Sequence, residues 1–167
     1  LKMEGIEFIT CFPSNPMIDA AAAEGIRPIK TRTERIAVQM ADGFSRASFG
    51  KRFGVCATQG GPGIENAFPG VAHAFADSVP ILVLPGGVAR RRISTLPSFS
   101  AVKNYGGITK WVDSINFADR IPEMMRRAFT YLRMGRPGPV MLELPIDVAD
   151  EEFDDATLQR TLKTMSQ

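Results

Sequence analysis

The sequence has little cysteine, and it lacks a long hydrophobic run. Its two cysteines, Cys11 and Cys56, are too few for a disulfide scaffold in 167 residues. Each lies inside an apolar stretch, so we expect two buried free thiols and a reducing, cytoplasmic environment. No run reaches the roughly 18 apolar residues of a membrane helix, so we expect no membrane partner.

Histidine is almost absent, and several catalytic motifs are missing. His73 is the single histidine and lies in an alanine-rich helical run, where we expect it to pack against a helix or an interface. One histidine and two separated cysteines assemble no zinc ligand set, so we expect no metal on this chain. There is no Gly-x-Ser-x-Gly elbow, no Lys-Ser/Thr after Gly60–Gly63, and no dinucleotide fingerprint at Pro13–Pro16. The sequence therefore lacks the catalytic or binding residues of the common hydrolases, kinases and dehydrogenases.

An excess of charge is also missing. Lys and Arg number 20 against 18 Asp and Glu, a net charge of +2. This balance is too weak to indicate a nucleic-acid partner. The basic cluster Arg90–Arg92 is not interleaved with aromatic residues, and we expect a solvated loop there.

What is present fits one folded α/β domain, with 44% hydrophobic and 23% charged residues. Glycine and proline cluster where short apolar runs end, as turn residues do. Such runs favour strands buried on both faces of a sheet. The four expected strands, each followed by such turn residues, are Glu7–Phe12, Phe53–Thr58, Val79–Leu84 and Pro139–Leu144.

Helical patterns separate these runs at Glu34–Ala47, Ile64–Ala76 and Ile121–Met134. Thr33 is the expected N-cap of the first helix, and Pro69 should kink or restart the second. Alternating strands and helices predict a three-layer α/β fold, a mainly parallel sheet with helices on both faces. In the first helix, apolar residues at spacings of four, four and three lie on one helical face: Ile36, Met40, Phe44 and Ala47.

We expect residues 1–149 to form the domain and residues 150–167 a linker or tail toward a further domain. Asp150–Asp155 is acidic and turn-like, as at a domain edge. The chain begins with Leu1 rather than Met, so we also expect it to be part of a longer polypeptide.

Glu34 is the first candidate site residue. It begins a helix whose same face carries Ala37, Val38 and Ala41, so its carboxyl is expected to be partly buried. An ordinary first-turn glutamate that favours the helix dipole fits the spacing as well or better.

Two loops add to this candidate site. Gln59–Asn66 is a Gly/Pro loop between an expected strand and helix, and Pro13–Pro16 follows the first strand. Both fall at the carboxyl edge of a parallel sheet, where ligands bind in such folds. A tight strand-to-helix turn explains the glycines equally well. The pattern alone thus indicates an organic ligand site and leaves the ligand open.

Four motifs in order give the chain a resemblance to a known family. It resembles the N-terminal pyrimidine-binding domain of thiamine-diphosphate enzymes, the acetolactate synthase, pyruvate oxidase and benzoylformate decarboxylase group. The matches extend from about Gly5 to Val148, nearly the whole chain. They are Thr31–Arg35 with Met40–Arg46, Gly61–Gly63 with Asn66, Asp77–Pro80, and Gly135–Val140 with Leu144–Val148.

The resemblance implies decarboxylation or carboligation of a 2-keto acid, with the cofactor as electron sink. It implies that Glu34 is catalytic, hydrogen-bonding N1′ of the aminopyrimidine and promoting its imino tautomer, in place of the ordinary first-turn role. Gln59 would lie on the substrate side. The implied cofactor-binding residues are Pro13, Ser14, Glu34, Thr58, Pro62 and Asn66.

The chain departs from the family pattern at several positions. Thr33 stands where the family has His or Asn, and Pro13-Ser14 replaces Pro-Gly. The Phe-Gln-Glu segment of acetolactate synthases is Phe99-Ser100-Ala101 here, which leaves a decarboxylase, a lyase or another carboligase open. Two alternatives to an enzyme domain are a non-catalytic homologue serving as a binding or regulatory module, and a flavodoxin-like or other nucleotide-binding domain.

The family binds diphosphate and Mg²⁺ through a Gly-Asp-Gly motif in another domain, and this sequence contains no Gly-Asp-Gly. The resemblance therefore implies a diphosphate-binding partner domain or subunit and a homodimer or homotetramer. A flavin (FAD), where an enzyme of this family carries one, would sit in a middle domain outside this chain. The expected contact surface includes Ala72, His73, Phe75 and Ala76.

Overall fold

The computed structural model describes residues 1–96, 99–152, 154, 156 and 159. They form one six-stranded sheet in the order β2-β1-β3-β4-β6-β5, and every paired strand is parallel. Consecutive parallel strands need crossover connections, which the helices supply. The strands are β1 Phe8–Cys11, β2 Arg27–Lys30, β3 Gly54–Thr58, β4 Ile81–Gly87, β5 Trp111–Ser114 and β6 Val140–Pro145.

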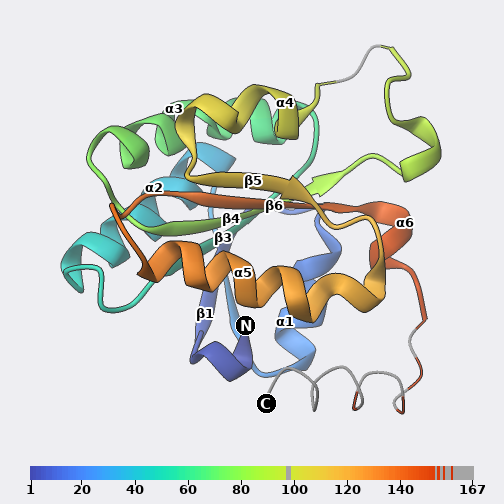
Figure 1. Cartoon of the computed structure of the whole chain (residues 1–167), viewed down its shortest axis with the longest axis horizontal. Coiled ribbons are helices and arrows are strands. Elements are labelled where there is room, and N and C mark those ends of the chain that lie inside the picture. The colour runs from blue at the N-terminus through green and yellow to red at the C-terminus, as the bar shows by residue number, and fades with distance from the viewer. Residues whose placement is uncertain (97–98, 153, 155, 157–158, 160–167) are drawn as a thin grey trace.

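Helices cover both faces of the sheet (Figure 1). One buried cluster joins the sheet to α1 and α5, and a second joins it to α2, α3 and α4. The predicted three-layer α/β fold is therefore confirmed. The helices are α1 Pro16–Ala23, α2 Glu34–Ala47, α3 Pro62–Ala76, α4 Ala101–Tyr105, α5 Ile121–Arg133 and α6 Ile146–Ala149, with short 3₁₀ turns η1 Lys2–Glu4, η2 Arg90–Arg92, η3 Gly106–Ile108 and η4 Ala118–Arg120.

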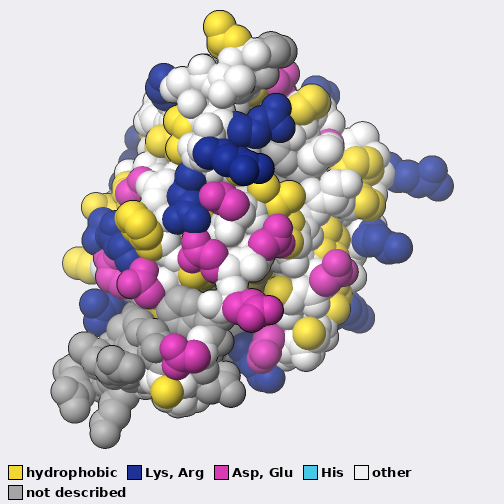
Figure 2. All heavy atoms as spheres, turned by 90° about the vertical axis from the view of Figure 1, so that its right-hand side faces the viewer, with side chains coloured by type: hydrophobic (Ala, Val, Ile, Leu, Met, Phe, Trp, Pro, Cys, Tyr) yellow, Lys and Arg dark blue, Asp and Glu magenta, His cyan; other side chains and the backbone are white. Residues whose placement is uncertain are grey.

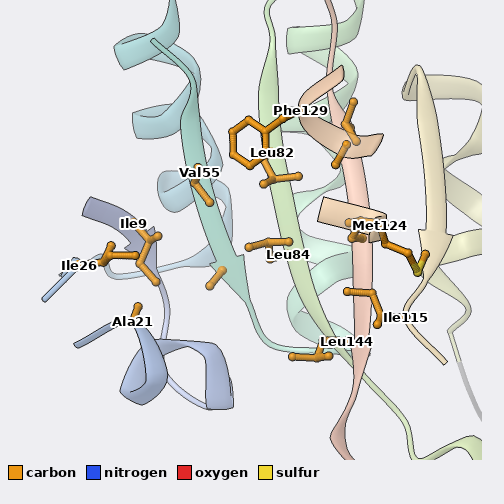
Figure 3. Close-up of a cluster of buried hydrophobic side chains, with 14 of the residues drawn as sticks. Ile9, Ala21, Ile26, Val55, Leu82, Leu84, Ile115, Met124, Phe129 and Leu144 are labelled. Atoms are coloured by element: carbon orange, nitrogen blue, oxygen red, sulfur yellow. The ribbon is translucent and has the colours of Figure 1, made fainter. Parts of the chain in front are cut away.

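The central strands are buried on both faces, as their apolar runs predict. All residues of β3 are buried, and Cys11 and Cys56 are buried free thiols on opposite faces of the sheet. Figure 3 shows part of the cluster under α1 and α5, in which Leu82 of the sheet lies beside Phe129 of α5. The sequence prediction of two buried thiols is confirmed.

The four predicted strands are present, and the prediction omitted the two at the edges of the sheet. β2 and β5 pair on one side only, and their residues are half-buried or exposed. An edge strand tolerates charge and proline, and Arg27–Lys30 carries both. Neither edge strand therefore shows the continuous apolar run that marks a central strand.

The expected turn at Pro85–Gly87 is wrong, because β4 continues through it. Gly86 and Gly87 pair with Leu144 and Pro145 of β6, which itself includes the proline expected to end it. A Cβ added at Gly60 would lie 2.3 Å from the carbonyl oxygen of Gly86. The glycines at positions 60 and 86 thus allow two backbone segments to lie close together, and they do not form the expected turn.

The face of α2 that carries Ile36 and Met40 is not its buried face. Ile36 and Met40 are 40% and 41% exposed, whereas Ala37, Val38 and Ala41 are fully buried. Small residues face the sheet because α2 packs closely against both β3 and α3. In α3, Pro69 does not divide the helix, which runs from Pro62 to Ala76.

Arg90 is not the solvated loop residue expected from its cluster. It forms ion pairs with Asp147 of α6 at 2.9 Å and with Glu151 at 2.5 Å. Glu151 thereby ties the start of the predicted acidic linker to the domain. Residues 153, 155 and most of the predicted tail lie outside the described residues. Within the described ranges, no helix is long and apolar enough to cross a membrane.

Candidate functional site

The candidate site lies where β1 and β3 end and where α2 and α3 begin. Phe12 N donates to the carbonyl of Ala57 at 3.3 Å, so the loops after β1 and β3 leave the sheet side by side. Figure 2 views the molecule from the side on which the strands end, where acidic and basic side chains lie close together. Among the described residues, no group of three or more His, Cys, Asp or Glu could hold a metal ion.

Glu34 is a buried carboxyl held by a hydrogen bond. It is the first residue of α2 and only 5% exposed. Asn66 Nδ2 donates to its Oε2 at 3.0 Å. Thr33, the predicted N-cap, accepts from Ile36 N at 3.3 Å, which fixes the turn that carries Glu34. The N-cap prediction is confirmed, and so is the burial expected from the small residues around Glu34.

The first turn of α3 leaves room for this carboxyl because Gly63 has no side chain. A Cβ added there would lie 2.6 Å from Oε1 of Glu34 and 2.6 Å from Cβ of Gln59. No real Cβ makes such contacts, so only glycine fits without displacing its neighbours. Pro62 occupies the first helical turn, where its missing N–H has no cost. The Gly-Pro-Gly motif therefore shapes the wall opposite Glu34.

Asn15, in the loop after β1, is not among the site residues that the sequence predicts. It is 6% exposed, and its Nδ2 donates to the carbonyls of Thr58 at 2.8 Å and Leu84 at 3.0 Å. Its Oδ1 accepts from Met17 N at 2.9 Å and caps α1. Asn15 thus joins the ends of β3 and β4 to the first loop. An Asn-Pro pair at a helix start signals the cap, but nothing local signals the long-range bonds.

Ser14 and Pro13 are exposed residues of the same loop. Ser14 has φ of +76°, in the left-handed region that favours glycine. The backbone here keeps a glycine-type conformation although the residue is serine. The serine that departs from Pro-Gly here thus has a backbone conformation that glycine favours.

Thr58 ends β3 with a polar atom that has no partner. Its side chain is completely buried, and its Oγ1 forms no hydrogen bond within the described structure. Buried hydroxyls are nearly always paired, so Oγ1 of Thr58 keeps unused hydrogen-bonding capacity at the strand end. Gln59, the next residue, is exposed.

The structure thus brings some predicted residues together and leaves others apart. Glu34 and Asn66 touch, and Gln59 borders Gly63 beside them. Pro13, Ser14 and Pro62 are exposed. The described structure places His73 on the surface of α3, where Nε2 lies 3.2 Å from Asp77.

Two of the sequence motifs hold each other rather than a ligand. Arg46 pairs with Asp42 at 2.7 Å and with Asp77 at 2.8 Å. Ser45 Oγ donates to the carbonyl of Pro80 at 2.7 Å and accepts from Gly54 N at 2.8 Å. The end of α2 is therefore anchored to the starts of β3 and β4, which fixes the position of α2 on the sheet.

Comparison with known proteins agrees with this geometry. The model of the thiamine pyrophosphate enzyme, N-terminal TPP binding domain, matches residues 1–115. A probable acetolactate synthase large subunit of Methanocaldococcus jannaschii is 39% identical over 159 residues, covering 92% of this chain and 27% of that protein. The acetolactate synthase large subunit of Lactococcus lactis is 38% identical over 162 residues, covering 93% of this chain and 28% of its own length.

The chain thus spans about a quarter of the length of these relatives. The matched region contains both site loops and the buried Glu34–Asn66 pair. The chain therefore belongs to the thiamine pyrophosphate enzyme family, as an N-terminal TPP-binding domain.

Proposed function

We propose that this chain binds the aminopyrimidine of thiamine diphosphate in an enzyme that decarboxylates or joins 2-keto acids. The observation that carries the proposal is the buried carboxyl of Glu34, oriented by Asn66 at the sheet edge where ligands bind in parallel α/β folds. Burying a carboxyl is costly, so the presence of Glu34 at a ligand edge favours a chemical role.

The residues present fit the pyrimidine end of that cofactor. Asn66 bonds to Oε2 of Glu34, so Oε1 keeps capacity to share a proton with a ring nitrogen of the ligand. Gly63 keeps the space beside Oε1 open, and the buried Oγ1 of Thr58 offers an unpaired donor or acceptor. Pro13, Ser14 and Pro62 supply exposed loop surface on the same edge.

In this proposal, the role of Glu34 is to share one proton with the aminopyrimidine ring. When bound, thiamine diphosphate supplies the carbanion chemistry and the electron sink for 2-keto acids. With the cofactor bound, Glu34 would share a proton between its carboxyl oxygen and ring atom N1′, which would favour the imino form of the aminopyrimidine. Asn66 keeps the carboxylate in one orientation, and the small residues of α2 exclude water from it.

The site needs a second domain to be complete. This chain has no Gly-Asp-Gly, so we propose that another domain or subunit binds the diphosphate and Mg²⁺. The outer side of α2 supports a protein contact, because Ile36 and Met40 are large apolar residues exposed next to Glu34. Ala76 and His73 on α3 are also exposed. A dimer or tetramer that joins the two kinds of domain follows from this proposal.

The relatives favour an acetolactate synthase-like reaction, since both are named as acetolactate synthase large subunits. We extend this to the chain as a carboligation, with a decarboxylase or lyase as the alternative class. Gln59 lies beside Gly63 and is the proposed substrate-side residue. Its exposure leaves it free to face a substrate above the cofactor.

The test is Glu34→Gln in the enzyme assembled with its diphosphate-binding domain, assayed on pyruvate. We expect turnover to fall by at least about 100-fold, the usual contribution of a positioned acid or base. The thermal unfolding midpoint should stay close to that of the parent. The control is Glu65→Gln, an exposed carboxyl in the first turn of α3. Near-full activity of Glu34→Gln would exclude the proposed role.

A non-catalytic homologue is the competing proposal, and the sequence departures motivated it. The structure weakens this argument for a non-catalytic homologue. At the two departures from the family pattern, Thr33 caps α2 and Ser14 has a glycine-type backbone conformation. The two proposals differ in one measurement. A non-catalytic module would not bind thiamine diphosphate with Mg²⁺ in isothermal titration, even with the diphosphate-binding domain present.

A further inference from the structure

A cavity of about 370 Å³ lies at the amino ends of the strands, at the other end of the sheet from Glu34. It is enclosed by the turn before β1, the loop between α2 and β3, the last residues of α5 and the residues that lead into β4 and β6 (Figure 1). Its volume is within the usual range of small-molecule sites in proteins. The proposed function uses no residue of this cavity.

The walls of the cavity combine aromatic rings with arginines. The guanidinium carbon of Arg52 lies 5.1 Å from the ring centre of Phe44. That of Arg133 lies 5.6 Å from the ring centre of Phe53. Stacking of this kind holds a guanidinium plane in one orientation, so less conformational freedom is lost when the guanidinium binds an anion. The cavity therefore suits a ligand that carries both a negative charge and a flat apolar body.

Positive charge exceeds negative charge among the side chains that line the cavity. Arg52 pairs with Glu7 at 2.9 Å, and Arg133 pairs with Glu4 at 2.5 Å. The side chains of Arg52 and Glu7 are 50% and 74% exposed, and exposed ion pairs contribute little. A guanidinium has five N–H donors, so Arg52 keeps donors for a carboxylate. Lys51 also lines the cavity and forms no ion pair within the part of the chain that the structure describes.

Phe49, at the edge of the cavity, contradicts two local preferences. It is 89% exposed, and its φ of +53° lies in the left-handed region that disfavours a bulky residue. Phe49 N donates to the carbonyl of Arg46 and Gly50 N donates to that of Ser45, both at 2.9 Å. These bonds form the helix end at which glycine is the usual residue after the cap. Burial does not account for a phenylalanine there, and residues held against local preference cluster at functional sites.

We propose that this cavity binds a small aromatic carboxylate. Arg52 and Lys51 bind the carboxylate, and the ring of Phe49 packs on the aromatic body of the ligand. The loop that carries these three residues is held in shape before a ligand binds, because Ser48 Oγ accepts from Arg52 N at 3.2 Å. The site does not depend on the proposed function, since it uses neither Glu34 nor the loops after β1 and β3.

The test measures binding of 2-naphthoate to this chain by isothermal titration, with 2-naphthamide as an uncharged analogue of similar shape. We expect saturable binding of 2-naphthoate and at least about 10-fold weaker binding of 2-naphthamide, because charge-assisted hydrogen bonds are the stronger ones. In amide NMR spectra, 2-naphthoate should shift the resonances of Lys51 and Arg52 and leave that of Glu34 unchanged. Absence of saturable binding, equal binding of the two compounds, or shifts at Glu34 in place of Lys51 and Arg52 would overturn the proposal.

Two substitutions with matched controls tie the binding to this cavity. Arg52→Gln should weaken 2-naphthoate binding by at least about 10-fold, whereas Lys103→Gln, at an exposed position of α4 outside the cavity, should not change it. Phe49→Gly should weaken binding without lowering the thermal unfolding midpoint, because glycine favours a positive φ. Ser94→Gly, at φ +67° outside the cavity, relieves a similar strain and should leave binding unchanged. Unchanged binding in Arg52→Gln or in Phe49→Gly would overturn the proposal.

Discussion

Asn66 of α3 donates a hydrogen bond of 3.0 Å to Oε2 of Glu34, the first residue of α2. This bond joins the first turns of two helices that pack against each other on one face of the sheet. The carboxyl at the centre of the proposed function therefore depends on an amide 32 residues away.

Replacing Asn66 tests this dependence. Asn66→Ala should lower the free energy of unfolding by about 1–3 kcal/mol, because a buried carboxylate loses a hydrogen bond. Asn66→Asp should cost more, since a second carboxylate would face Glu34. Chemical denaturation at pH 7 measures both. Asn104→Ala, which removes an exposed amide bond to the Ser100 carbonyl, should cost less than about 1 kcal/mol. Equal losses at positions 66 and 104 would contradict the proposed pairing.

Gly63 is expected to reject even the smallest side chain. Gly63→Ala places a Cβ within 2.6 Å of Oε1 of Glu34, so we expect a loss of about 1–3 kcal/mol. Gly43 lies in α2 with nothing within 4 Å of an added Cβ, and Gly43→Ala should stabilise by about 0.5–1 kcal/mol. Thermal unfolding of the two variants gives opposite signs if crowding at Glu34 decides the outcome. A stable Gly63→Ala protein would show that the carboxyl has room to move.

The parts of the fold that follow local rules could be predicted from the sequence. β3 and the bounds of α2 follow from a buried apolar run and from Thr33 as N-cap. The edge strands β2 and β5 could not be predicted in this way. Each pairs with a neighbour on one side only, so its residues are more exposed and need not be apolar. Close helix packing selects small residues on the buried side of α2, and the larger Ile36 and Met40 stay outside.

The spacing of residues in the sequence predicted only part of the candidate site. The motifs located Glu34 and Asn66, but their contact depends on how α2 and α3 cross. Asn15 was passed over because its bonds reach Thr58 and Leu84, which are 43 and 69 residues away in the chain. Long-range hydrogen bonds of this kind leave no periodic signal in a sequence.

Ser14 carries a testable backbone strain. Its φ of +76° costs a non-glycine residue about 1–2 kcal/mol. Ser14→Gly removes that strain but loosens the unfolded chain, so we expect a net gain of about 0.5–1 kcal/mol. Ser14→Val should destabilise, because a β-branched residue fits this region poorly. The order Gly, Ser, Val in thermal midpoints is the expected result, and a valine variant as stable as the parent would contradict it.

The two thiols should differ in reactivity. Burial raises the pKa of Cys56 to about 12, which leaves roughly one part in 10⁴ as thiolate at pH 8. Burial also raises the pKa of Cys11, but Lys30 opposes the shift. At pH 8, Ellman's reagent should therefore react slowly with the native chain, first at Cys11, and rapidly at both thiols in guanidinium chloride. Cys11→Ala assigns the two phases. Fast reaction of the native Cys11→Ala protein would show that Cys56 is accessible.

The bond between Arg90 and Asp147 should make stability depend on pH. Arg90 donates to both carboxylate oxygens of Asp147, from its backbone N–H and its Nε, and holds the pKa of that carboxyl below its ordinary 3.8. The carboxylate therefore stabilises the fold fully above pH 3.8, and this contribution is lost as the pH falls through the lower folded pKa. Asp147→Asn should lower the thermal midpoint at pH 7, and the gap to the parent should narrow progressively below pH 3.8. Asp119→Asn, at an exposed carboxyl in η4, should show little gap at either pH. A gap of constant size for Asp147→Asn would mean that packing, rather than the charge beside Arg90, explains the loss.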